Sequence, residues 1–176
     1  PAFFSGTFAS SGITELPSES FGTTQIMQIS TDYFRSTFEG SGLQRVPQDS
    51  FGTTFSPVVP DDVFVRTFAD SDLLELSENS FNMSNVSMVG NNFFSYAFAG
   101  TKLTSLPDMS FGASQMTMMG SGVFDHTFAG VSTLKALPAD SFLFGRLGVA
   151  DSGLLDFAFE GTSLSRSEVL RVIAGW

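Results

Sequence analysis

Phenylalanine recurs at a spacing of 30 residues along this chain, and this period constrains the fold more than any other feature. Three positions of the repeat hold Phe, and they account for 16 of the 21 Phe residues. We call them the three Phe columns: Phe4, Phe34, Phe64, Phe94 and Phe124; Phe8, Phe38, Phe68, Phe98, Phe128 and Phe159; Phe21, Phe51, Phe81, Phe111 and Phe142. One residue is inserted near Val131, and Leu155 continues the first column. Self-similarity at a fixed period of this length indicates a repeat architecture.

Each period predicts one coil of a repeat solenoid, built from two short strands and two helical turns. Residues 13–16 and 26–29 are apolar-flanked runs that we interpret as the strands of one coil. Pro17 suits the start of a short helical turn, because its missing N–H needs no partner there. Phe34 and Phe38 have the i, i+4 spacing that places two rings on one helical face.

Capping residues fit the longer helical turn. Asp32, Asp62 and Asn92 stand two residues before a Phe, where an N-cap is expected. Gly40 and its counterparts Gly100 and Gly130 suit a left-handed C-terminal cap. Stacked at about the inter-strand spacing of ~4.8 Å, roughly five coils would extend about 25 Å.

The pattern divides the chain into residues 1–164, the array of about five coils, and residues 165–176, a C-terminal capping helix. Ser165 and Glu168 match a capping box, and an apolar face follows. That face comprises Val169, Leu170, Val172 and Ile173. Since Pro1 already lies inside a repeat, we expect the array to be truncated at its N-terminal side.

The Phe columns are expected to form the core, because Phe can be buried without leaving a polar atom unsatisfied. Beside them run columns of hydroxyl residues, expected to satisfy backbone groups between coils. These are Ser20, Ser50, Ser80, Ser110 and Ser141, and Thr7, Thr37, Thr67 and Thr127. An ice-binding role for the Thr column is disfavoured, because each Thr directly precedes an inward Phe and no flat Thr row appears.

Charge and composition narrow the function. The formal net charge of −10 argues against nucleic acid or an anionic membrane as a partner, since both attract basic patches. Cysteine is absent, which excludes disulfides and thiolate chemistry. No stretch approaches the ~18 apolar residues of a membrane span, so membrane insertion is not expected.

No constellation predicts a catalytic residue, a cofactor site or a metal site, and we do not expect an enzyme. His126 occupies the position of Tyr96 and Phe157 in other repeats, which favours partly buried packing. The aspartates at 32, 61, 62 and 151 lie near expected helix starts, without the spacing of a calcium-binding loop. Asn82 and Asn85 match the N-glycosylation pattern, which matters only in a eukaryotic secreted protein.

Positions that vary between otherwise regular repeats are the candidate partner-binding residues. On the first strand these are Thr14, Glu15, Gln44, Arg45, Leu74, Glu75, Thr104, Ser105, Lys135 and Ala136. Repeat proteins bind partners through such laterally stacked surfaces. On the second strand, Gln28, Val58, Met88 and Met118 form a column that becomes more apolar along the chain. We favour a core position for that column over an exposed apolar stripe.

Two motifs carry a family resemblance. LTSLPDMSFG (Leu103 to Gly112) and VFDHTFAG (Val123 to Gly130) resemble the BspA-type leucine-rich repeats, as does FNMSNVSMV (Phe81 to Val89). The family often has Cys after the Gly of its FxG turn, where this chain has Ser41, Thr101 or Val131. The resemblance covers essentially the whole chain and implies a leucine-rich-repeat-like α/β solenoid.

The resemblance also implies a secreted or surface-exposed bacterial or protist protein, and members are often adhesins. We therefore expect an extracellular recognition module without enzymatic activity that binds protein or glycan on another cell or matrix. The alternative is a structural subunit that self-associates into a filament, sheath or surface layer.

Overall fold

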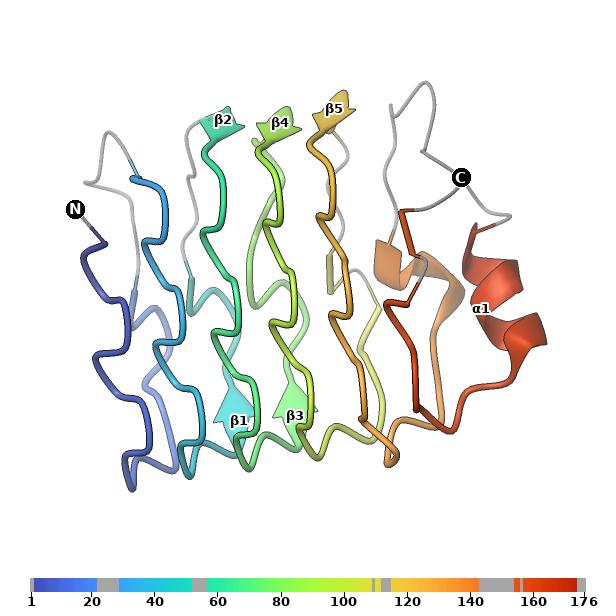
Figure 1. Cartoon of the computed structure of the whole chain (residues 1–176), viewed down its shortest axis with the longest axis horizontal. Coiled ribbons are helices and arrows are strands. Elements are labelled where there is room, and N and C mark those ends of the chain that lie inside the picture. The colour runs from blue at the N-terminus through green and yellow to red at the C-terminus, as the bar shows by residue number, and fades with distance from the viewer. Residues whose placement is uncertain are drawn as a thin grey trace.

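The computed structural model describes residues 2–21, 29–51, 57–108, 110–111, 115–142, 154–155 and 157–173 (Figure 1). Its regular elements are short: β1 (Arg45–Val46), β2 (Val58–Val59), β3 (Glu75–Leu76), β4 (Met88–Val89), β5 (Met118–Met119), the 3-10 helix η1 (Ala139–Phe142) and α1 (Arg166–Ile173). Parallel pairing joins β1 to β3 in one small sheet and β2, β4 and β5 in another. The two sheets lie at opposite sides of the view in Figure 1.

The prediction of a leucine-rich-repeat-like solenoid of strand-and-helix coils is wrong. The described residues contain five two-residue strands in two small sheets and a single α helix, not an array of coils with many strands. The prediction of a longer helical turn in each repeat is also wrong, because residues 31–40 form a run of tight turns. Every fourth residue there has positive φ, with 61° at Asp32, 54° at Ser36 and 64° at Gly40, and such residues interrupt a right-handed helix.

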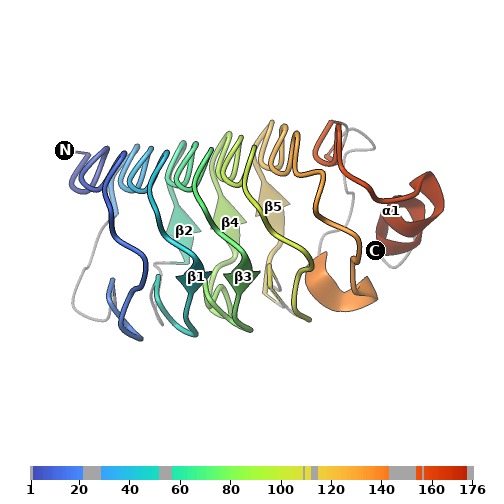
Figure 2. The same ribbon diagram turned by 90° about the horizontal axis from the view of Figure 1, so that it is seen from below.

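Hydrogen bonds in this run alternate between two directions. The N–H of Arg35 donates to the Asp32 carbonyl at 3.2 Å, within its own turn. The N–H of Phe34 donates instead to the Val63 carbonyl at 2.9 Å, across to the next turn segment. The segments therefore lie side by side along one edge of the molecule, as Figure 2 shows. A four-residue turn repeat, not a helix, explains the Phe34–Phe38 spacing.

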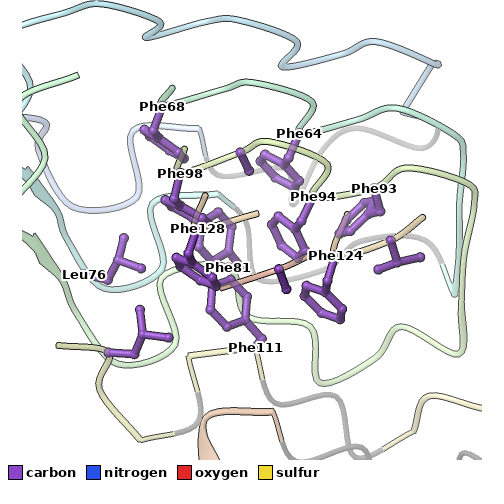
Figure 3. Close-up of a cluster of buried hydrophobic side chains, with 14 of the residues drawn as sticks. Phe64, Phe68, Leu76, Phe81, Phe93, Phe94, Phe98, Phe111, Phe124 and Phe128 are labelled. Carbon is purple, nitrogen blue, oxygen red and sulfur yellow. The ribbon is translucent and has the colours of Figure 1, made fainter. Parts of the chain in front are cut away.

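The Phe columns form the main part of the core, as predicted, together with buried Leu, Val and Met side chains, and Figure 3 shows part of it. Rings within a column stack in parallel, with centroids 5.2 Å apart and an interplanar angle of 11° for Phe34 and Phe64. Rings of different columns mostly meet edge to face, at 5.5 Å and 85° for Phe51 and Phe64. Both arrangements suit the aromatic quadrupole, so each ring is stabilised by neighbours in its own and adjacent columns.

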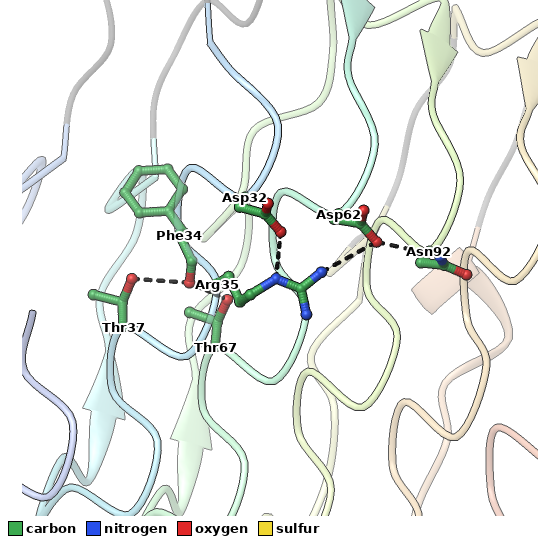
Figure 4. Close-up of polar contacts among 7 residues, drawn as sticks. All are labelled: Asp32, Phe34, Arg35, Thr37, Asp62, Thr67 and Asn92. Atoms are coloured by element: carbon green, nitrogen blue, oxygen red, sulfur yellow. Dashed lines mark hydrogen bonds and ion pairs between the residues drawn. The ribbon is translucent and has the colours of Figure 1, made fainter. Parts of the chain in front are cut away.

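Hydroxyl groups satisfy backbone carbonyls inside this structure, as predicted. The Thr67 hydroxyl donates to the Phe34 carbonyl at 2.7 Å, and the Thr37 hydroxyl donates to the same carbonyl at 2.8 Å (Figure 4). Both threonines are buried. In the serine column, the Ser50 hydroxyl donates to the Pro47 carbonyl at 2.7 Å. A buried carbonyl without such a partner would be costly, which explains why hydroxyl residues recur here.

The C-terminal helix α1 begins with the expected capping box. The Glu168 carboxylate accepts a bond from the Ser165 N–H at 2.8 Å, and the Glu168 N–H donates to the Ser165 hydroxyl at 3.3 Å. Hydrogen bonds from Ser165 hold the pKa of Glu168 below its ordinary value. Val172 is buried and Val169 packs on the core, but Leu170 is exposed, so the predicted apolar face is wrong at that position.

Candidate partner-binding site

All ten predicted partner-binding residues are exposed. Their exposure follows from the pattern of the four-residue run that contains the first strand. The first and last residues of each run pack on the core, and the two middle residues face solvent. In one repeat Leu43 and Val46 are fully buried, whereas Gln44 and Arg45 between them face solvent. In the next repeat Leu73 and Leu76 flank Leu74 and Glu75 in the same way. We call the surface formed by the ten residues the first-strand face.

Backbone pairing brings residues 30 or 31 apart next to each other on this face. Arg45 of β1 pairs with Glu75 of β3, and Ser105 forms a parallel bridge with Ala136. The Gln44 N–H donates to the Thr14 carbonyl at 3.0 Å, which aligns the first two repeats. The variable side chains thus form rows across neighbouring segments, where a single partner can contact several of them.

An open depression of about 870 Å³ lies on this face. Six of the ten predicted residues line it: Thr14, Glu15, Gln44, Arg45, Leu74 and Glu75. The other four lie on the same face toward the C-terminal repeats: Thr104, Ser105, Lys135 and Ala136. The structure therefore gathers the N-terminal six around one concavity and leaves the remaining four outside it.

Charged and apolar groups mix in the depression. The Arg45 guanidinium lies 3.5 Å from a Glu75 carboxylate oxygen, and both side chains are exposed. Such an exposed pair contributes at most about 1 kcal/mol to stability, so both groups can turn toward a partner at little cost. Glu15 and Glu78 add two further carboxylates, and Leu74 is 45% exposed. The lining can form hydrogen bonds and ion pairs and offers one apolar contact.

Sequence reasoning missed the residues that follow the first strand. Ser18, Gln48 and Glu78 also line the depression, each one residue after the position of Pro17, Pro47 or Ser77. They vary between repeats in the same way as the ten predicted residues. The same criterion of variation could therefore have found them, had it been applied beyond the strand.

The second-strand column lies on the surface, so the core position favoured for it is wrong. Val58 and Met118 are 52% and 58% exposed, and Met88 is half-buried. Each two-residue strand turns only one side chain inward, and in β2 and β4 the inward residue is Val59 or Val89. Gln28 lies outside the described residues. We call Val58, Met88 and Met118 the exposed apolar column.

His126 packs as predicted, with its ring between two others. Its centroid is 4.7 Å from that of Tyr96 and 5.3 Å from that of Phe157. Its Nδ1 is 2.8 Å from an Asp125 carboxylate oxygen. The parallel stack makes a partly buried imidazole favourable at this position.

Polar contacts engage the aspartates that were expected as helix caps. Arg35 pairs with Asp32 and also reaches Asp62, at 3.4 Å, and the Asn92 amide donates to Asp62 at 3.2 Å (Figure 4). The prediction that these residues cap helices is wrong, because tight turns and not helices follow them. Asp32, Asp62 and Asn92 themselves have positive φ. Asp61 accepts the Asn91 N–H at 2.8 Å, and Asp151 lies outside the described residues.

The two glycosylation-pattern asparagines differ in their contacts. The Asn82 amide donates to an Asp49 carboxylate oxygen at 3.0 Å, whereas Asn85 is exposed. Within the described part of the chain, no group of three or more His, Cys, Asp or Glu side chains is arranged to hold a metal ion. Nor does that part contain a helix long and apolar enough to cross a membrane.

Comparison with known protein families, with curated proteins and with solved structures gives no match to this chain. The resemblance to BspA-type repeats therefore stays a prediction that rests on the sequence motifs.

Proposed function

We propose that this chain is a non-enzymatic recognition module that binds a partner protein or glycan through the first-strand face. One observation carries the proposal: ten positions chosen for their variability are all exposed, and six of them surround one depression. The apolar residues on either side of them are buried in four of the five repeats and partly buried in the first, so the framework is constant while the solvent-facing residues differ. Variable side chains on a constant framework are the kind of surface through which repeat proteins bind partners, and the exposed rows here offer a comparable surface.

The mixed chemistry of the depression suits such a role. A protein partner can pair with the carboxylates, accept hydrogen bonds from Arg45 and Gln44, and bury Leu74; a glycan can hydrogen-bond the same polar groups. The motif resemblance supports an extracellular or cell-surface location, where adhesion to another cell or matrix would occur.

A binding screen tests the proposal. The purified chain would be measured against immobilised matrix proteins and glycans, beside the double variant Arg45→Ala/Leu74→Ser and the control Met118→Ser on the other sheet. We expect a bound partner whose affinity falls at least about tenfold in the double variant, since central interface residues contribute most of the binding energy. The control should keep its affinity. A partner insensitive to the double variant, or the absence of any partner, would contradict the proposal.

A second candidate function, a structural subunit, is favoured by the exposed apolar column. Three apolar side chains aligned on neighbouring strands can pack against a second copy of the chain. Light scattering coupled to size-exclusion chromatography over a concentration series tests it. Concentration-dependent multimers that are lost in Met118→Gln would support assembly, whereas a monomer at all concentrations would exclude it for this chain.

A further inference from the structure

A column of side chains runs along the edge formed by the tight-turn segments. It ends at Phe157, an aromatic ring that is largely exposed. Ser36, Arg66, Tyr96, His126 and Phe157 occupy equivalent places in successive turn segments, and all have φ between 52° and 62°. The rings of Tyr96, His126 and Phe157 stack almost in parallel, with interplanar angles of 3° and 7°. We call these five residues the stacked surface column.

Phe157 has one ring face open to solvent. It is 62% exposed, although its neighbours Ala158 and Phe159 are buried. Among the described residues only the His126 ring stacks on it. A ring covered on one face and exposed by this amount must have its other face accessible. Exposed aromatic faces carry the negative part of the ring quadrupole, which attracts cations.

Nearer its other end, one place after Ser36, the same column already contains the guanidinium of Arg66. Arg66 lies one segment before Tyr96, and its Nε and Nη2 donate to Glu39 at 3.1 and 2.7 Å. Asp70 lies 3.3 Å from the guanidinium on another side. The hydrogen bond from Arg66 lowers the pKa of Glu39 below its ordinary value. Glu39, three residues after the column member Ser36, therefore holds the guanidinium of Arg66, which is the next member of the column.

Glu160 repeats the position of Glu39 at the open end. It stands three residues after Phe157, as Glu39 stands three residues after Ser36. Its backbone has the same role, because its carbonyl accepts the Gly130 N–H at 2.7 Å as the Glu39 carbonyl accepts that of Ser10 at 2.7 Å. The Glu160 carboxylate lies 3.5 Å from His126 Nε2, and its side chain is exposed and free to turn.

We propose that the open end of the stacked surface column binds an arginine side chain of a partner protein. The guanidinium lies flat on the free face of Phe157 and donates hydrogen bonds to Glu160, as Arg66 does to Glu39. Arginine fits better than lysine, because the planar guanidinium stacks on aromatic rings and donates two bonds to one carboxylate. The net charge of −10 favours a basic partner. This site is separate from the first-strand face and does not depend on the proposed function.

Nuclear magnetic resonance titration tests the site with a defined probe, the peptide acetyl-Gly-Arg-Gly-amide. Its control is the same peptide with citrulline, which keeps the shape and removes the charge. We expect saturable shifts of the Phe157 and His126 ring resonances with the arginine peptide alone. Glu160→Gln should weaken binding by roughly threefold to tenfold. Phe157→Leu should remove the part of the affinity that comes from stacking of the guanidinium on the ring. Phe3→Leu, at another exposed ring, should leave binding unchanged.

Each other outcome would overturn the proposal. Equal shifts with the citrulline peptide would show that charge is not recognised, and equal shifts at Phe3 and Phe157 would show nonspecific ring contacts. Binding unaffected by Glu160→Gln would remove the role of the carboxylate. If Phe157→Leu disturbs the backbone amide spectrum, Glu160→Gln still decides, because its exposed side chain has no packing role.

Discussion

Replacing one central ring of a Phe column should cost much more stability than replacing the ring at its end. Phe68 is fully buried and lies between Phe38 and Phe98, with centroid distances of 5.7 and 5.3 Å. It also meets Phe51 edge to face at 5.5 Å. Phe8 belongs to the same column, is half-buried, and stacks on one column neighbour, Phe38 at 5.4 Å.

The magnitudes follow from burial and from the number of ring contacts. Truncating a buried Phe to Ala costs about 3–5 kcal/mol, because apolar contact is lost and a cavity remains. Each aromatic pair adds roughly 0.5–1.5 kcal/mol beyond area burial. We therefore expect Phe68→Ala to lower the free energy of unfolding by about 4 kcal/mol, and Phe8→Ala by about half of that, since water can fill the space left at Phe8.

Urea unfolding followed by far-ultraviolet circular dichroism measures both variants. The dependence of the unfolding free energy on urea concentration must be the same in wild type and variants. A changed slope would show that unfolding is no longer cooperative, which is a risk where segments contact only their neighbours. Equal costs for Phe68→Ala and Phe8→Ala would refute the argument that stacking on both faces stabilises the column. A cost below about 1 kcal/mol for Phe68→Ala would show that the site collapses around the missing ring.

Three further predictions concern close packing, charge and the helix cap. Gly90→Ala should lower the free energy of unfolding by more than about 2 kcal/mol, because the added Cβ would lie 2.5 Å from the Asp61 backbone nitrogen. Gly130→Ala should cost about 1 kcal/mol, because Gly130 has φ 74° but no atom within 4 Å of the added Cβ. Thermal unfolding measures both variants. Glu39→Gln should lower stability by less than about 1 kcal/mol at pH 7, because the pair with Arg66 is partly exposed. Since Arg66 lowers the pKa of Glu39 in the folded state, this difference should be present above the ordinary carboxylate range and disappear as pH falls below it; a difference that grows in acid would contradict the pairing. Ser165→Ala should reduce helical circular dichroism by fraying α1, whereas Ser163→Ala, just outside the capping box, should not.

The sequence by itself determined that the Phe columns lie inside. The 30-residue period identified the Phe columns as core and the hydroxyl columns as partners of backbone carbonyls, and the Ser165–Glu168 spacing identified the capping box of the last helix. These inferences succeed because burial of Phe and satisfaction of polar groups depend on residue chemistry and on period, not on the backbone path. For the same reason, variable positions between buried apolar residues, such as Gln44 and Arg45 between Leu43 and Val46, could be placed on the surface.

Only the tertiary structure decided the backbone and the orientation of the short strands. A four-residue spacing of Phe34 and Phe38 fits both a helix and a succession of four-residue turns. The choice depends on cross-segment bonds such as Phe34 to Val63, and no local pattern reports them. A two-residue strand is too short for alternation to show its inward side, so the exposure of Met118 could not be deduced. The exposure of Phe157 likewise depends on how the last segments pack, because among the described residues only the His126 ring stacks on it.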